Sequence, residues 1–266
     1  MTVAIGFLCH DGVVIGADSM LTSTIGGMAV GHHKGQKVHL LSGEQVFAFA
    51  GDQGQASRLQ FLADGFYQRS DPATHAIHFP LSLTKAVIEQ FHQTGIGNQI
   101  NLNALLGFVH GGYHHLCAFE GVVQPRLLDS AHFYVALGNG KLSADPFLRF
   151  LVDIFCANGP PSVAEAIFLT AWAIKHVCNV NPGGVAPPTR IAVMELKNGN
   201  FYCSRTLSAN EVDDQGERIE SAIKALTEWR ASLIPSNVDA AMDAAIPPAP
   251  MGLDSDQYMS QSKSDQ

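Results

Sequence analysis

The second residue of the chain, Thr2, carries a hydroxyl group, and removal of Met1 would leave a free α-amine on the same residue. The pKa of an α-amine is about 8, so this amine can accept a proton from the neighbouring hydroxyl, directly or through a water molecule. A hydroxyl activated in this way can attack the carbonyl carbon of an amide. Because many chains begin with Met-Thr, these two residues predict a nucleophile only together with further evidence.

Two pairs of adjacent histidines, His32-His33 and His114-His115, offer a different chemistry, the binding of a metal ion. Neither pair stands at a recognised ligand spacing from a cysteine or a carboxylate. We therefore expect these histidines on a loop or a strand face, and we expect no metal and no cofactor.

The composition is that of a globular chain of 266 residues, 46% hydrophobic and 15% charged, that can bury a substantial core. The first ten residues contain no Lys or Arg and no run of eighteen apolar residues occurs, so we expect neither a secretory signal nor a membrane partner. The five cysteines form no Cys-x-x-Cys pair, which is typical of reduced thiols. These features predict a cytoplasmic protein.

The formal net charge of −8 is concentrated near the C-terminus. Residues 207–266 hold 11 acidic and 4 basic residues, a balance of −7, which leaves about −1 for the preceding body. A nearly neutral body lacks the basic surface that nucleic acids require. We expect no nucleic-acid partner.

Apolar alternation and turn residues predict a sheet that begins almost at the first residue. Residues 2–9 and 13–18 are expected to form a hairpin, because Asp11-Gly12 between two apolar runs is a strong turn signal. A second hairpin is expected over 37–50, and Asp52 is expected to cap a helix. The other predicted elements are a helix over 81–92, strands over 100–110, 113–119, 122–127 and 132–137, helices over 144–156 and 162–178, and a hairpin over 189–206.

Strands and helices come in separate runs, which favours an α+β fold of antiparallel sheets covered by helices over a parallel-sheet fold. Apolar residues of 210–234 share one stripe and predict a further helix. After Pro235 the composition turns to Ala, Pro, Asp, Ser and Gln, which is typical of disorder. The predicted organisation is a body over residues 1–206, a helical extension over 207–234 and a disordered acidic tail over 235–266.

The run TVAIGFLCHDGVVIGADSM, followed by QKVHLL and VFAFAGDQGQASRL, resembles the β-type subunits of the proteasome family, whose catalytic members are N-terminal threonine hydrolases. Asp18 stands sixteen residues after Thr2, the spacing of the corresponding Asp in that family. Lys37 matches a lysine at the start of the third strand, and Ala50-Gly51 matches the end of the fourth. The resemblance extends to about Thr206. The chain is most similar to the betaproteobacterial proteasome homologue, with the ancestral-β-subunit (Anbu) group second.

This resemblance implies the four-layer αββα sandwich of the N-terminal-nucleophile hydrolases and a role for each matched residue. Thr2 Oγ1 would attack a peptide carbonyl and form an acyl ester, while the Thr2 amine carries protons. Lys37 would lower the pKa of the hydroxyl, Asp18 would keep Lys37 charged, and the Gly51 N–H would face the oxyanion. The alternatives are a surface ion pair for Asp18 and Lys37, and a bend with positive φ for Gly51.

The same resemblance implies supporting and pocket residues. Gly138-Asn139-Gly140 stands where the family has Gly-Ser-Gly, and the segment 179–184 lacks a carboxylate and a hydroxyl that the family has there. Both departures favour a catalytically silent protein. The implied supporting residues are Ser19, Asn139, Gly140, Asn179 and Gly183. The implied pocket residues are Leu21, Gly35, Phe49 and Gln53, which predict an apolar first pocket with room for bulky side chains.

The sequence therefore predicts a threonine endopeptidase subunit that cuts unfolded polypeptides inside a homo-oligomeric double ring of about 14 subunits. An ATP-dependent unfoldase is a further expected partner. Two alternatives stay open at this stage. One is a silent ring scaffold or peptide-binding protein, and the other is an amidase of the same fold that acts on small amides.

Overall fold

The computed structural model describes residues 2–25, 28–95, 99–199 and 201–233. The chain divides into two units, residues 1–220 and the residues from 221 onward. The acidic tail predicted for 235–266 lies outside the described residues. The predicted domain boundaries after residues 206 and 234 stay a prediction.

The first sheet is antiparallel throughout. In spatial order it contains β10 (Tyr134–Leu137), β1 (Ala4–Leu8), β2 (Gly12–Ala17), β11 (Arg190–Lys197) and β12 (Phe201–Thr206). The hairpin of β1 and β2 confirms the prediction from Asp11-Gly12, and its register places Ala4 opposite Ala17. Because β1 pairs with β10 on its other side, the start of the chain is held between two strands.

The second sheet is also antiparallel and follows the order of the chain. It contains β5 (Val38–Leu41), β6 (Gln45–Gly51), β7 (Leu102–His110), β8 (Tyr113–Glu120) and β9 (Gln124–Leu127). The sequence predicted each of these strands. Together with the helices, the two sheets confirm the expectation of antiparallel sheets in a mixed α/β structure.

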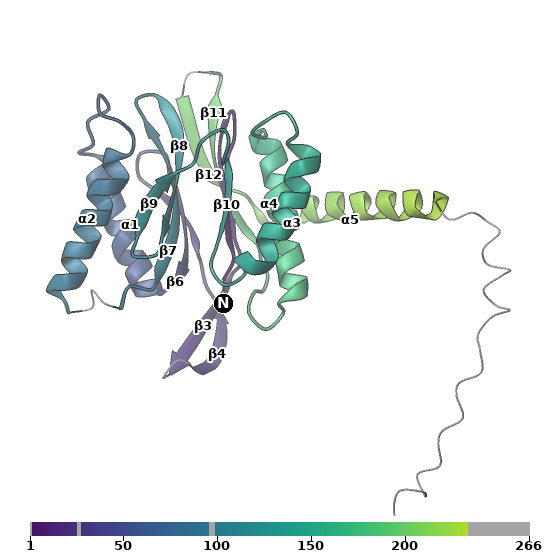
Figure 1. Cartoon of the computed structure of the whole chain (residues 1–266), viewed down its shortest axis with the longest axis horizontal. Coiled ribbons are helices and arrows are strands. Elements are labelled where there is room, and N and C mark those ends of the chain that lie inside the picture. Colours follow the sequence, from purple (N-terminus) through teal and green to yellow (C-terminus); the bar gives the residue numbers. More distant parts are fainter. Residues whose placement is uncertain (1, 26–27, 96–98, 200, 234–266) are drawn as a thin grey trace, which may run out of the picture. The chain divides into compact units, whose positions relative to one another are not determined.

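The two sheets pack face to face, and helices cover their outer faces (Figure 1). Small residues allow the close approach: a Cβ added to Gly107 in β7 would lie 2.9 Å from a methyl group of Val13 in β2. Apolar side chains of both sheets fill the space between them, among them Ile15, Val46 and Leu105. Helices α1 (Gln53–Tyr67) and α2 (His78–Gln93) lie on the second sheet, and helices α3 (Lys141–Phe155) and α4 (Val163–Val180) lie on the first.

A side-chain cap marks the start of α1 and of α4, whereas α2 and α3 begin without one. The Asp52 side chain accepts a hydrogen bond from Gln55 N at 2.8 Å, as its N-cap position predicted. Helices α2 and α3 each start three residues earlier than expected, at His78 and Lys141. In α2 the reason is Pro80, which lies in the first turn, where its missing N–H costs nothing.

One element was not predicted, a separate hairpin of β3 (Met20–Ile25) and β4 (Met28–Lys34). Its strands contain two threonines, a serine and two histidines, and they lack the apolar alternation that marks a strand with one buried face. Figure 1 shows this hairpin beyond the edge of the two larger sheets.

Two helices need separate description. Within the described residues, α4 has the length and apolar composition that a membrane-crossing helix needs, and half of it is buried inside the fold, as in a core helix. Helix α5 (Ala209–Ser232) matches the predicted extension. Its buried residues Gln215 and Ile219 belong to the first unit, and the helix continues into the second.

Candidate active site

The structure brings Thr2, Asp18 and Lys37 into direct contact. Lys37 Nζ donates one hydrogen bond to Thr2 Oγ1 at 2.8 Å and another to Asp18 Oδ1 at 2.8 Å. The side chains of Lys37 and Asp18 are 1% and 0% exposed, and Thr2 is 9% exposed. The alternative of a surface ion pair for Asp18 and Lys37 is therefore wrong, because both charges are fully buried.

Strand pairing explains this meeting of residues from two sheets. Asp18 follows the last residue of β2, and its backbone N–H donates to Val3 O at 3.3 Å, which places it beside the start of β1. Lys37 precedes β5 in the second sheet, where its carbonyl accepts a hydrogen bond from Phe49 N at 3.3 Å. The lysine side chain thus joins the two sheets at the end of β1.

The carboxylate of Asp18 is fixed by three donors. Val3 N donates to Oδ1 at 3.1 Å, Met20 N donates to Oδ2 at 2.9 Å, and Lys37 supplies the ion pair. Burial lowers the pKa of Lys37 below its ordinary value, and the adjacent Asp18 charge opposes this shift. A lysine with a lowered pKa exchanges protons more readily near neutral pH than a solvated lysine does.

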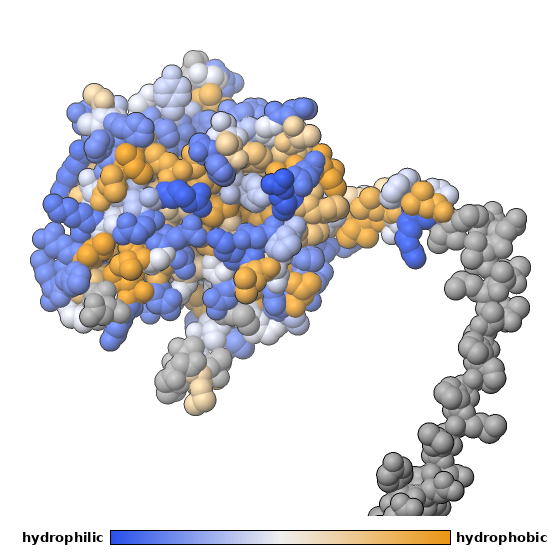
Figure 2. All heavy atoms as spheres, viewed as in Figure 1, coloured by the Kyte–Doolittle hydropathy of each residue, from blue (hydrophilic) through white to orange (hydrophobic). Residues whose placement is uncertain are grey.

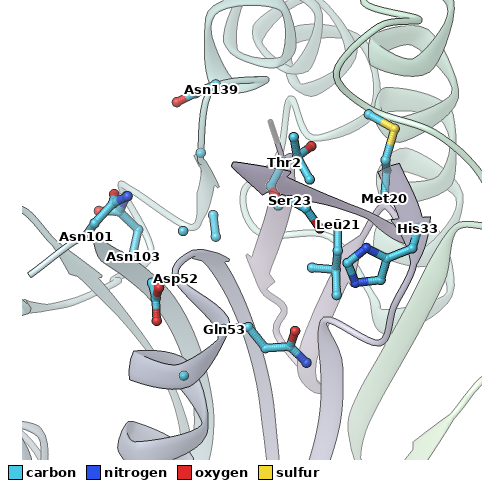
Figure 3. A pocket seen from close by; sticks show the side chains of 15 residues that line it. Thr2, Met20, Leu21, Ser23, His33, Asp52, Gln53, Asn101, Asn103 and Asn139 are labelled. Atoms are coloured by element: carbon cyan, nitrogen blue, oxygen red, sulfur yellow. The ribbon is translucent and has the colours of Figure 1, made fainter. Parts of the chain in front are cut away.

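A cavity of about 480 Å³ opens beside the Thr2 side chain. Figure 3 shows Leu21 and His33 on one side of this cavity and Asp52, Asn101 and Asn103 on the other. The 20–23 segment of β3 and His33 of β4 form one wall, and the junction of β6 with α1 forms another. The lining is mainly polar, so an apolar pocket does not describe it.

Two glycine-containing turns shape the cavity around Thr2. Gly51 ends β6 with φ +115° and lines the cavity, and an added Cβ there would collide with the Asn101 carbonyl. In the 138–140 turn, Gly140 N donates to Thr2 O at 3.0 Å. An added Cβ on Gly138, which has φ +83°, would collide with the same oxygen. Asn139 lines the cavity from this turn.

The structure brings only some of the predicted supporting residues to this cavity. Asn139 and Gly140 contact it or Thr2 directly, as described above. Ser19 lies outside it, and its hydroxyl donates to Pro188 O at 2.5 Å. Asn179 lines a different cavity, and Gly183 is exposed without a contact to Thr2. Asn179 belongs to the last turn of α4, which ends at Val180, and Gly183 follows in the loop after that helix.

The predicted pocket residues divide in the same way. Leu21 and Gln53 line the cavity, but Gly35 and Phe49 do not. The Leu21 side chain lies directly over Gly35 and fills the space that this glycine was expected to leave open. Phe49 is 3% exposed and packs into the apolar core between the second sheet and α1 and α2. The predicted apolar first pocket with room for a bulky side chain is therefore not formed by these four residues.

Sequence reasoning missed the polar residues that line the cavity, among them Ser23, His33, Asn101 and Asn103. His33 was expected on a loop or a strand face, and it lies on β4, but no role at the Thr2 site was predicted for it. His33 belongs to the cavity wall that the β3–β4 hairpin forms. The sequence signal that could have predicted this hairpin is Gly26-Gly27 between two runs of strand length. Among the described residues, no group of three His, Cys, Asp or Glu side chains is placed to hold a metal ion.

Comparison with known proteins gives structural relatives only, since no family model and no curated protein matches the chain. The chain is similar to the Anbu (Gly-1) mutant from Hyphomicrobium sp. strain MC1, with 15% identity and a TM-score of 0.65, over 86% of this chain and 97% of that one. It is similar to Anbu (ancestral beta-subunit) from Yersinia bercovieri, with 13% identity and a TM-score of 0.64, over 88% and 98%. It is also similar to the chain in a helical assembly of the Anbu complex from Pseudomonas aeruginosa, with 12% identity and a TM-score of 0.65, over 90% of this chain and 99% of that one.

At these identities the comparisons establish a shared fold and leave the function to the site itself. The fold is shared over nearly the whole length of the Anbu chains. These neighbours bear the name of the group that the sequence ranked second, after the betaproteobacterial homologue.

Proposed function

We propose that this chain is an N-terminal-nucleophile hydrolase with a four-layer αββα fold, and that Thr2 is its nucleophile once Met1 is removed. More particularly, we assign it to the Anbu type of proteasome-like peptidase subunit. The observation that carries the proposal is the position of the Lys37 ammonium, 2.8 Å from both Thr2 Oγ1 and Asp18 Oδ1, beside a cavity of about 480 Å³. The fold shared with the Anbu proteins supports it.

The geometry supports the following steps. The Thr2 hydroxyl attacks the carbonyl carbon of a peptide bond, and its proton passes to the Thr2 amine. The amine then delivers that proton to the departing nitrogen, the peptide C–N bond breaks, and an ester on Thr2 remains. Water cleaves the ester and restores the hydroxyl. The Lys37 cation stabilises the negative charge that develops on Thr2 Oγ1, and Asp18 keeps Lys37 in place.

Gly51 is the proposed oxyanion donor. It ends β6 on the wall of the Thr2 cavity, and its φ of +115° needs a glycine. Removal of such a donor typically reduces the rate by about 10² to 10³. The mainly polar lining, with His33 and Asn103, suits the polar backbone of a peptide substrate.

A silent scaffold or peptide-binding protein is the second candidate function. One observation favours it: the predicted supporting residues Asn179 and Gly183 do not reach the Thr2 cavity. The buried contact between Thr2 and Lys37 favours the hydrolase, since burying a charged pair is costly and a scaffold has no use for it. The amidase of the same fold would differ from the peptidase only in substrate size.

Self-assembly is part of the proposal. The neighbour from Pseudomonas aeruginosa is described as a helical assembly, so proteins of this fold form oligomers. The far half of α5 exposes the apolar residues Ile223, Leu226 and Trp229, followed by Leu233 just after the helix. Figure 2 shows apolar surface along this helix in orange. We propose that such surfaces join copies of the chain into a double ring in the cytoplasm. The ring would enclose the Thr2 sites and admit only unfolded polypeptides, which an unfoldase would supply.

Intact mass and covalent labelling test the proposed function. The purified chain should lack Met1, and a β-lactone probe should add one equivalent of mass at Thr2. Thr2→Ala should not be labelled, and Thr2→Ser should be. Thr227→Ala, which removes an exposed threonine hydroxyl on α5, is the matched control and should react like the wild type. A chain that keeps Met1, or equal labelling of Thr2→Ala and the wild type, would leave the silent scaffold as the function.

A further inference from the structure

A second cavity, of about 490 Å³, lies between α4, the segment 187–190 and the first half of α5. It is as large as the Thr2 cavity and shares no lining residue with it. Its volume is within the range of about 300–1,000 Å³ that is usual for small-ligand sites. All of its lining residues belong to the first unit of the chain.

Two exposed side chains of opposite charge, Arg190 and Asp213, stand in the wall of this cavity. Neither the Arg190 side chain nor the Asp213 side chain makes a hydrogen bond or an ion pair with any other described residue. A third charged residue of the wall, Lys175, is already satisfied, because its Nζ lies 3.1 Å from Glu220 Oε1. Both groups are therefore free to pair with a ligand that carries an anion and a cation.

The surface near these charges is apolar. Ala171 and Ile219 are buried residues of the wall, and Val212 extends the same surface on α5. An apolar side chain gains free energy when it moves from water to such a surface. The cavity therefore offers a cation, an anion and an apolar contact to one molecule.

We infer that this cavity binds short peptides with free termini and an apolar side chain, with the carboxylate at Arg190 and the ammonium at Asp213. A single apolar amino acid has the same zwitterionic chemistry in a smaller volume. Such molecules are the products that the proposed peptidase releases, so the cavity is a product-sensing site. This last step rests on the proposed function, whereas the binding itself does not.

The wall of the cavity is connected to the Thr2 site by hydrogen bonds. Pro188, which lines the cavity, accepts the 2.5 Å hydrogen bond from the Ser19 hydroxyl. Ser19 follows Asp18 in the chain, and its backbone N–H donates to Ala186 O at 3.2 Å. A ligand that shifts this segment therefore moves the residue next to the Asp18 carboxylate.

A second contact runs through Cys178, which also lines the cavity. Burial raises the pKa of the Cys178 thiol to about 11, with a further increase from the negative charge of Asp18 and an opposing effect of Lys37. The thiol thus lies close enough to the buried ion pair to sense both of its charges.

Isothermal titration of the full chain with L-leucyl-L-leucine tests the binding. We expect one site per chain, no binding of the acetylated and amidated dipeptide, and weaker binding of L-leucine. Arg190→Ala and Asp213→Asn should each raise the Kd about tenfold or more, because each removes a hydrogen bond to a charged group. Arg149→Ala, which removes an exposed ion pair on α3, is the control and should bind like the wild type. Equal binding by all four proteins would overturn the inference.

A matched pair of glycine variants separates the two cavities. Gly216 lines the second cavity on α5, and Gly65 lies on α1; a Cβ added to either meets no atom within 4 Å, so both helices should accept a side chain. Gly216→Leu should abolish dipeptide binding, while Gly65→Leu and Thr2→Ala should retain it. Loss of binding in Thr2→Ala with retention in Gly216→Leu would place the dipeptide in the Thr2 cavity and overturn the assignment.

Labelling by the β-lactone probe then tests the connection. Saturating dipeptide should change the labelling rate of the wild type and leave that of Gly216→Leu unchanged. A wild type that binds the dipeptide but never reacts with the probe would contradict the proposed function and retain the binding site. An unchanged rate in a reactive wild type would overturn the product-sensing role alone.

Discussion

Because Lys37 and Asp18 form a buried ion pair, we expect a substitution of Lys37 to lower the free energy of unfolding strongly, and a second substitution at Asp18 to restore part of it. Replacement of Lys37 by methionine keeps most of the side-chain volume but leaves the Asp18 carboxylate, which is 0% exposed, without its counter-ion. Two hydrogen bonds from Val3 N and Met20 N remain. Breaking a buried ion pair by removing one partner costs about 3–5 kcal/mol, and this is the loss that we expect for Lys37→Met.

The double variant Lys37→Met/Asp18→Asn should recover at least about 2 kcal/mol of this loss, because no buried charge is left. The amide oxygen introduced in place of the Asp18 carboxylate would still accept a hydrogen bond from the backbone. Both variants should fail to react with the β-lactone probe, since both lack the ammonium group beside Thr2 Oγ1. Stability and reactivity thus separate in the double variant.

Urea unfolding at a fixed protein concentration measures these free energies. Of the two tryptophans, Trp172 is 9% exposed on α4 and reports on the body, so a Trp229→Phe background removes the second signal. Lys85→Ala, which removes an exposed lysine on α2, is the control and should change stability by less than about 0.5 kcal/mol. A cost of less than about 1 kcal/mol for Lys37→Met, or a double variant no more stable than Lys37→Met, would show that the buried charge of Asp18 does not need Lys37.

Three further predictions follow from the geometry. Gly138→Ala should destabilise the fold by about 1–3 kcal/mol more than Gly112→Ala in urea unfolding, and it should slow labelling of Thr2. Both glycines have φ +83°, but only at Gly138 does an added Cβ collide with Thr2 O. Equal effects of the two variants would mean that the turn does not position Thr2. The free energy of unfolding should rise with pH between the lowered pKa of Lys37 in the folded chain and the ordinary lysine pKa, because the unfolded chain binds more protons in that range. Urea titrations at several pH values should show this rise in the wild type and not in Lys37→Met. Trp229→Ala should lower the mass of the assembly in light scattering, since Trp229 is a large exposed apolar residue of α5, whereas Thr227→Ala on the same helix should leave the mass unchanged.

Much of the fold could be predicted because its signals are local. The Asp11-Gly12 turn fixes the first hairpin, and the register of that hairpin places Asp18 beside the start of β1. Asp52 caps α1 through its own side chain, and Ser162 does the same for α4 together with Glu165. Such features act within a few residues of the chain, so one sequence is sufficient to find them.

The cavity could not be predicted in the same way, because its walls come from distant segments. Asn103 on β7, Asn139 in the 138–140 turn and His33 on β4 meet at the cavity only after the sheets pair. The β3–β4 hairpin was missed because its strands lack apolar alternation, which is the signal on which strand prediction depends. Gly35 was misplaced because a small residue leaves space only if no neighbour enters it, and Leu21 does.

The position of Lys37 also explains why stability and chemistry are linked in this fold. A lysine at this site must cross from the second sheet to the end of β1, and its side chain is 1% exposed. Asp18 alone offsets the charge, while the hydrogen bond to Thr2 Oγ1 holds the hydroxyl in one direction. A substitution that removes both buried charges, such as the double variant above, should therefore be more stable than one that leaves Asp18 unpaired, although both lose reactivity. The persistence of an unfavourable buried cation next to a hydroxyl is in itself an argument for a reaction at that hydroxyl.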